Sequence, residues 1–152
     1  MPTVTPFLWF DTQAEEAMNL YTSIFKRSKV ISVNRAQGRV MGVEFEVEGQ
    51  KFIGLNAGPQ HKFNEAVSFF VGSESQQEID DLWAKLTADG GKPGQCGWLK
   101  DKFGLSWQII PNALPRLMGG GGDPAASQRV MEAMFQMTKL DVNRLQQAFD
   151  GK

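Results

Sequence analysis

The same order of elements is predicted twice along this chain of 152 residues, and no other feature restricts the fold as much. Runs rich in β-branched and aromatic residues predict strands at 3–10, 29–36, 40–47 and 51–56, and a helix is predicted between the first two, ending at Phe25. A second series begins with a strand at 66–71 and a helix capped by Ser75, and it continues with strands at 92–97, 98–100 and 105–110. The repeat predicts two units of a strand, a helix and three strands, each with one sheet face left to cover.

The two predicted helices share one spacing of apolar residues. These are Ala14, Ala17, Met18 and Tyr21 in the first helix and Ile79, Leu82, Trp83 and Leu86 in the second. This spacing places one apolar stripe on each helix, which can pack on a sheet. Asp11 or Thr12 is predicted to cap the first helix, because both residue types accept hydrogen bonds from free helix amides.

A different pattern begins after residue 112. Residues 113–118 predict a short helix, Gly119–Gly122 a flexible break, and Asp123-Pro124 the start of a longer helix. A last helical stretch follows Asp141. The Met-rich apolar faces of these helices favour packing on their own domain or on a partner subunit over cofactor binding. If these helices pack on a partner subunit, the protein could be an interaction protein whose tail docks on another chain. This is one of three hypotheses for its function.

Composition argues against several classes of protein. The net charge is −1, from 16 basic and 17 acidic residues, so neither nucleic acid nor a membrane is an expected partner. No apolar run is long enough to span a bilayer, and a cytoplasmic location is expected. Cys96, the single cysteine, cannot form an internal disulfide. We interpret it as a packed small residue, with a reactive thiol as the alternative.

Residues 95–111 predict a hairpin, with a turn at 101–104 that closes on Gly104. Strand alternation places Leu105, Trp107 and Ile109 on one face and Ser106, Gln108 and Ile110 on the other. Gln108 has two interpretations. It either closes a hydrogen-bond network over a concave sheet, or it marks the place of a metal ligand.

Three blocks of sequence resemble one known family. They are TPFLWFDTQAEEAMNLYTSIF, LNAGPQHKFNEAVSF and CGWLKDKFGLSWQIIP, in this order along nearly the whole chain. The chain resembles the PhnB-like branch of the vicinal-oxygen-chelate superfamily, which has the glyoxalase, bleomycin-resistance and extradiol-dioxygenase fold. The resemblance implies an α+β fold of paired βαβββ modules around a concave mixed sheet, usually in a homodimer. We expect a single domain over 1–152, with modules at about 1–58 and 66–111 and C-terminal helices at about 113–150.

The resemblance also implies where a metal would bind. Metal-dependent members carry His, Gln or Glu ligands at positions that correspond here to Thr5, Gly54 or Asn56, Ala66 or Ser68, and Gln108. Only Gln108 has a matching side chain, and His61 lies in a connector outside these positions. One neutral amide is a poor ligand set for a divalent first-row metal, so no metal and no cofactor are expected. A metal-dependent glyoxalase- or dioxygenase-type enzyme that uses Gln108 is the alternative.

The preferred hypothesis is a metal-independent cavity for a small aromatic or amphipathic molecule. Strand alternation and the hairpin together predict an aromatic lining with a few neutral polar groups. The predicted ligand-binding residues are Thr5, Phe7, Trp9, Phe52, Asn56, Ser68, Phe70, Trp98, Ser106 and Gln108. The other possibility is that these aromatic side chains fill the interior and leave no pocket.

Three further patterns give weaker evidence about function. Relatives of this family often bear the name of a ubiquinone-precursor methyltransferase, but an adenosyl site would need a Gly-rich turn between a strand and a helix, and Gly119–Gly122 lies between two helices. Residues 62–65 either close over the cavity or form a solvated connector. Glu44, Glu46 and Glu48 alternate with apolar residues, which is typical of a solvated strand face.

Overall fold

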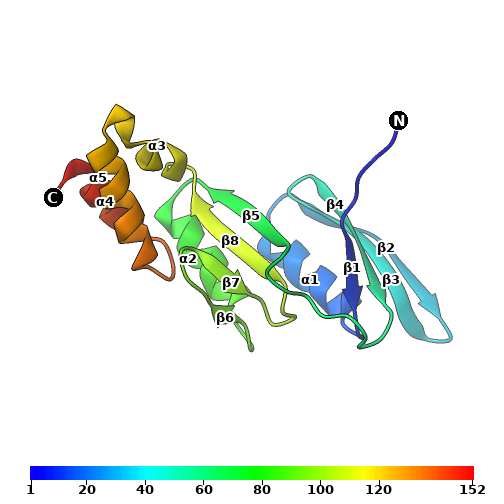
Figure 1. Ribbon diagram of the computed structural model, residues 1–152. Helices are drawn as coiled ribbons and strands as arrows, with labels where there is room; N and C mark the ends of the chain where they lie inside the picture. Colours follow the sequence, from blue (N-terminus) through cyan, green and yellow to red (C-terminus); the bar gives the residue numbers. More distant parts are fainter. The chain divides into compact units, whose positions relative to one another are not determined.

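A computed structural model describes residues 1–152 and divides into two compact units, Met1–Lys62 and Phe63–Lys152. The first unit consists of β1 (Phe7–Phe10), α1 (Ala14–Ile24), β2 (Ser28–Ala36), β3 (Arg39–Val47) and β4 (Gln50–Asn56). Its sheet has the order β1-β4-β3-β2, with β1 parallel to β4 and the other pairs antiparallel (Figure 1). The predicted βαβββ order is confirmed in this unit.

Aromatic packing between α1 and one face of this sheet forms the core of the first unit. Tyr21 of α1 lies 6.2 Å from Phe45 of β3 between ring centroids, and Phe45 stacks on Phe52 at 5.4 Å. All three side chains are buried, and burial of one such side chain contributes about 1.5–3 kcal/mol to stability. The apolar stripe predicted for α1 is confirmed, because Ala14, Ala17, Met18 and Tyr21 are buried.

The start of the first unit differs from the sequence prediction. β1 begins at Phe7 instead of Thr3, after Pro6, which has no amide hydrogen to donate to a sheet. The predicted cap of α1 by Asp11 or Thr12 is also wrong. Gln13 precedes the helix without a side-chain hydrogen bond, and Asn56 Oδ1, from β4, accepts from the Ala14 amide at 2.9 Å. A distant side chain therefore performs the role expected of a local one.

The second unit repeats the order with β5 (Ser68–Ser73), α2 (Gln76–Leu86), β6 (Lys92–Pro93), β7 (Trp98–Lys100) and β8 (Ser106–Pro111). Its sheet has the order β5-β8-β7-β6, and β5 is parallel to β8. The predicted Ser75 cap is confirmed, since Ser75 Oγ accepts from the Glu78 amide at 3.2 Å. The strand predicted at 92–97 is reduced to two residues, because Cys96 and Gly97 adopt left-handed backbone angles that interrupt a strand.

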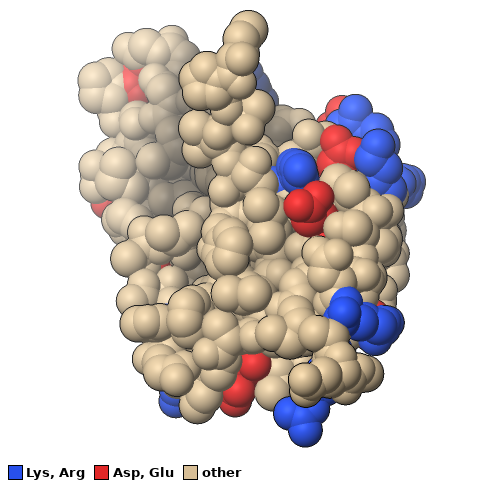
Figure 2. Space-filling view, turned by 90° about the vertical axis from the view of Figure 1, so that its right-hand side faces the viewer, with Lys and Arg blue, Asp and Glu red and all other residues tan.

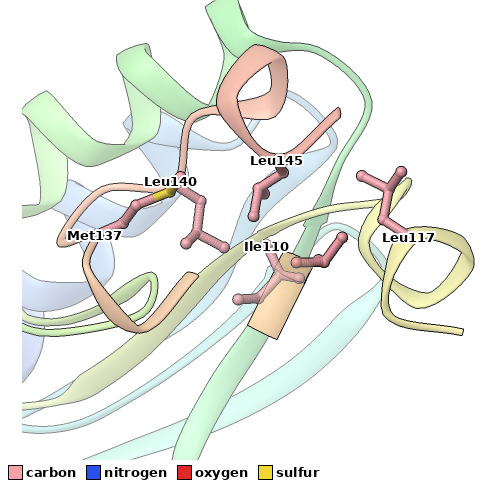
Figure 3. Packing of buried hydrophobic residues seen from close by; sticks show 6 residues of the cluster. Ile110, Leu117, Met137, Leu140 and Leu145 are labelled. Carbon is pink, nitrogen blue, oxygen red and sulfur yellow. The ribbon is translucent and has the colours of Figure 1, made fainter. Parts of the chain in front are cut away.

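The C-terminal extension, residues 112–152, contains α3 (Leu114–Met118), a 3₁₀ turn at Gly120–Gly122, α4 (Pro124–Phe135) and α5 (Val142–Asp150). Asp123 caps α4, as predicted, and Asp141 caps α5. The extension packs on the end of β8 through one apolar cluster, in which the side chains point toward one another (Figure 3). The buried members are Ile110, Leu117, Val130, Met137, Leu140 and Leu145. None of the helices combines the length and the apolar character needed to cross a membrane.

Candidate functional site

The β5–β8 sheet brings five predicted site residues to one face. Trp107 and Ile109 of β8 pair with Phe69 and Val71 of β5, and both β8 side chains are almost fully buried. Strand alternation therefore gives the opposite face a second set of side chains. This open face contains the predicted Ser68, Phe70, Trp98, Ser106 and Gln108, together with Lys100 of β7. The alternation predicted for β8 is confirmed.

Gln108 is the polar centre of the open face. Its Nε2 donates a hydrogen bond to Ser68 Oγ at 2.9 Å. The Oε1 atom takes no part in this bond and can accept from another donor. Phe70 lies opposite Gln108 on β5 and is 63% exposed, and Trp98 lies opposite it on β7 and is half-buried. The amide is therefore flanked by two aromatic side chains.

Ser106 adds a hydroxyl to the open face at the register position of Ser68. The residue is 1% exposed, and its Oγ has no hydrogen-bond partner within the protein. A buried hydroxyl without a partner destabilises the folded protein. A bound group that formed a hydrogen bond with the Ser106 hydroxyl would remove this cost.

Asp101 holds the turn of the hairpin, and sequence reasoning treated it only as a turn residue. Its Oδ1 accepts from the amides of Phe103 and Leu105 at 2.9 and 3.0 Å, and its Oδ2 accepts from the indole of Trp107 at 2.9 Å. The residue is 2% exposed. Only the spacing of Asp101, Gly104 and Trp107 could have indicated these hydrogen bonds. An Asp that begins a turn often accepts from the amide two residues later.

The connector before β5 is attached to the edge of this sheet. The Glu65 carboxylate forms an ion pair with Lys100 of β7, and the hydrogen bond from Lys100 lowers the pKa of Glu65. Asn64 Oδ1 accepts from the Ala66 amide at 2.9 Å. Both side chains are exposed, as expected for a solvated connector.

The sheet of the first unit has an open face of its own. Phe7 and Trp9 of β1 pair with Ile53 and Leu55 of β4, on the side away from the buried Leu8 and Phe10, and Phe7 is 56% exposed. The connector folds back onto this face. Trp9 Nε1 donates to the Gly58 carbonyl at 2.9 Å, and the His61 ring meets the Trp9 ring edge-on at 4.8 Å.

Three of the predicted binding positions in the first unit are not on this open face. Phe52 is buried against Phe45, and the Asn56 amide is used by the Ala14 amide and by the Val40 carbonyl at 3.1 Å. The predicted alternation of β4 is therefore wrong by one residue. Gly54, a proposed ligand position, also faces α1, since a Cβ there would lie 3.5 Å from Ala14 Cβ. Thr5, the third of these binding positions, precedes the first residue of β1.

Charged side chains on β2, β3 and β4 form pairs across the strands. Lys29 lies 3.4 Å from Glu46, and Lys51 lies 3.3 Å from Glu44. The glutamate side chains are 29% and 33% exposed, and each faces a lysine on the neighbouring strand. On the face shown in Figure 2, basic and acidic side chains lie beside one another instead of forming a patch of one sign.

A shallow hollow of about 350 Å³ lies beside the turns that follow α1 and β3. It is lined by Lys26, Arg27, Ser28, Lys29, Glu46 and Gly49. Arg27 and Lys29 already pair with Glu48 and Glu46, which satisfies most of its charge. None of the predicted binding residues lines it.

The residues near Gln108 do not fit a divalent first-row metal. The open face offers the Gln108 amide, two serine hydroxyls and the Lys100 ammonium group, whereas such ions prefer imidazole, thiolate or carboxylate ligands. No three His, Cys, Asp or Glu side chains in the chain are grouped closely enough to hold a metal ion. No reaction step through a metal follows from this site.

The two βαβββ units have the arrangement of the glyoxalase/bleomycin-resistance class of proteins. The family model described as 3-demethylubiquinone-9 3-methyltransferase matches residues 2–110, and the chain belongs to this PhnB-like family of the vicinal-oxygen-chelate superfamily. No curated protein matches the chain.

Solved structures agree with this assignment. The PhnB protein from Bacillus cereus is 33% identical, with a TM-score of 0.68, and the match covers 72% of this chain and 99% of that protein. Protein PA1353 from Pseudomonas aeruginosa is 17% identical, with a TM-score of 0.59 over 73% of this chain and 98% of its own. A glyoxalase/bleomycin resistance protein from Albidiferax ferrireducens is 12% identical, with a TM-score of 0.51 over 72% and 98%. The last two show the fold alone.

Proposed function

We propose that this chain is a metal-independent, homodimeric protein that binds a small aromatic or amphipathic molecule on the open face of β5–β8. The observation that carries the proposal is the Gln108–Ser68 hydrogen bond beside the exposed Phe70 ring. The bond fixes the Gln108 amide, so its Oε1 can accept from a ligand hydroxyl or amide without further ordering.

The chemistry of the open face indicates the class of ligand. Phe70 and Trp98 offer flat apolar surface on both sides of Gln108, and the polar groups between them are neutral. Such a surface suits a planar ring with one or two hydrogen-bonding groups, since aromatic pairs gain free energy beyond the area they bury. Lys100 is the one charged side chain of this face, and it is already paired with Glu65.

The family description names a methyltransferase, but the residues of this chain do not support that activity. Gly119–Gly122, the longest run of glycines, lies between α3 and α4, and Gly90-Gly91 follows a helix, so neither is a turn that leads from a strand into a helix. A binding protein therefore fits the residues better than a group-transfer enzyme.

The direct test is a binding titration with N-phenyl-1-naphthylamine, a neutral aromatic dye with one N–H donor, on protein treated with a chelator. We expect saturable binding that is about 2- to 10-fold weaker in Gln108→Leu, which removes the hydrogen bonds but keeps most of the volume. Gln128→Leu is the matched control, because Gln128 is an exposed residue that bonds only Glu132. Equal affinity in both variants would contradict the proposal.

Metal analysis of the untreated protein separates the second candidate, a metal-dependent glyoxalase- or dioxygenase-type enzyme. The position of Gln108 on the last strand favours this candidate. One tightly held ion per chain that is lost in Gln108→Leu would support it. Light scattering tests the homodimer, and a mass of one chain at micromolar concentration would contradict that part of the proposal.

A further inference from the structure

The C-terminal extension lies outside the region that this chain shares with its relatives, because the family match ends at residue 110. It contacts the second unit at the end of β8, at α2 and at the turn Gln95–Gly97. The segment between α4 and α5, residues Met137–Asp141, is named here the clamp segment. It lies beside the turn Gln95–Gly97, which leads directly into Trp98 of the open face.

The turn has an unfavourable backbone conformation. Cys96 has φ of 58° and Gly97 has φ of 86°, and the left-handed region is costly for a residue with a side chain. Such a conformation persists only where neighbouring groups hold it. The clamp segment supplies two of these groups, because the Cys96 amide donates to the Met137 carbonyl at 2.9 Å and the Gly97 amide donates to the Thr138 carbonyl at 2.8 Å.

The opposite side of the turn is fixed to β8. The Gly97 carbonyl accepts from the Ile109 amide at 2.8 Å. A Cβ at Gly97 would lie 3.0 Å from Ile110 Cδ1 and 3.1 Å from Leu140 Cδ1, so the turn fits closely between β8 and the clamp segment. Trp98, the next residue, pairs with Gln108.

The clamp segment is in turn held by α2. Gln76 Nε2 donates to the Leu140 carbonyl at 3.0 Å, and Gln76 Oε1 accepts from the Val142 amide at 2.8 Å. Lys139 forms an ion pair with Asp80 at 2.7 Å. One helix thus holds the clamp segment from its middle to the residue that follows it.

We propose that the clamp segment is a positioning element that holds the Gln95–Gly97 turn and thereby sets the place of Trp98 opposite Gln108. The role of the clamp segment in ligand binding rests on the proposed function. Its hold on the turn can be measured without a ligand. Gln76 and Lys139 act through the turn and are therefore positioning residues of the open face.

The test is the double variant Gln76→Ala/Lys139→Ala, which leaves the turn itself unchanged. We expect amide hydrogen exchange at Cys96 and Gly97 to become about tenfold faster, because their opening no longer has to break the contacts with α2. The indole resonance of Trp98, assigned with Trp98→Phe, should shift in the full chain without ligand. Cys96 is the single cysteine, so its labelling rate with a small disulfide reagent gives a second readout.

Gln77→Ala/Lys85→Ala is the matched control. Gln77 makes the same type of bond to Asp81 as Gln76 makes to Asp80, on the same helix but without contact to the clamp segment. The control should leave exchange at Cys96 and Gly97 unchanged. Lys139→Arg, which can keep the ion pair, should restore most of the protection when it replaces Lys139→Ala in the double variant.

Two results would overturn the proposal. One is unchanged exchange at Cys96 and Gly97 while the Val142 amide exchanges faster, since the segment would then move without moving the turn. The other is faster exchange with an unchanged Trp98 resonance. Neither result bears on the proposed function, which the dye titration of Gln108→Leu decides separately. If the double variant does not fold, Lys139→Met alone is compared with wild type by the same readouts.

Discussion

The Asp101 carboxylate accepts a hydrogen bond from the indole nitrogen of Trp107, with 2.9 Å between Oδ2 and Nε1. The bond joins the turn of the hairpin to the buried face of β8, and the open face lies on the other side of the same strand. Because side chains on the two faces of a strand share one backbone, the bond also helps to fix the backbone of β8 at Gln108.

Asp101→Asn should destabilise the second unit by about 1–3 kcal/mol, because the amide that replaces Oδ2 would point a donor at the Trp107 indole hydrogen. Urea unfolding measures this change in free energy. In Trp107→Phe, which has no indole donor, Asp101→Asn should cost less. Additive effects in the double variant would show that the two side chains are not coupled.

Gly97→Ala should destabilise the protein more than Gly104→Ala, by about 1–3 kcal/mol. The two glycines have nearly the same φ, 86° and 87°, so the backbone strain of alanine is the same at both positions. Only Gly97 is crowded, with Ile110 and Leu140 close to the added methyl group, whereas nothing lies within 4 Å of it at Gly104. Thermal unfolding of both variants gives the difference, and equal losses would argue against close packing of the clamp segment.

Asn56→Ala should destabilise the first unit by about 1–2 kcal/mol and leave dye affinity unchanged. The side chain caps α1 through the Ala14 amide and also donates to the Val40 carbonyl, so we expect a structural role for it and no contact with the dye. Urea unfolding and the dye titration check the two halves of this prediction. A weaker dye affinity at unchanged stability would restore the binding role.

The ion pair between Asp80 and Lys139 should make the C-terminal extension sensitive to acid. The hydrogen bond from Lys139, and then that from Gln76, lower the pKa of Asp80 below its ordinary value of 3.8. The folded state thus favours the charged carboxylate. Its contribution is complete above the pKa of the unfolded chain and is lost as pH falls through the lower pKa of the folded state.

The free energies of unfolding of wild type and Lys139→Met, measured from pH 7 to pH 3, test this dependence. Their difference should be constant down to about pH 5 and should shrink below about pH 4. The pair is partly exposed, so added salt should reduce the difference as well. A difference that is the same at pH 3 and pH 7 would contradict the assignment.

Patterns that act over a few residues were sufficient for most of the fold. The apolar spacing of α1 and α2, the Ser75 cap and the Asp123-Pro124 start are local features, and the structure has them where the sequence predicted them. The alternation of β8 was also readable. There, polar Ser106 and Gln108 separate the apolar Trp107 and Ile109, which defines the two faces.

The failures concern residues whose role depends on distant partners. In β4, Phe52, Ile53 and Leu55 are all apolar, so the sequence does not show which of them faces α1. Asn56 caps a helix 42 residues earlier, and this pairing is visible only after the sheet has formed. His61 was placed outside the site as a connector residue, and its contact with Trp9 likewise depends on the path of the chain between them.

The central claim is that the open face around Gln108 binds a small planar molecule without a metal. Chemical-shift mapping of chelator-treated protein with N-phenyl-1-naphthylamine, the neutral dye of the titration, tests it most directly. We predict saturable shifts at the Gln108 side-chain amide, the Ser68 amide and the Trp98 indole, with one common dissociation constant. Shifts confined to other residues, or shifts at Gln108 that appear only when a divalent metal is added back, would contradict it.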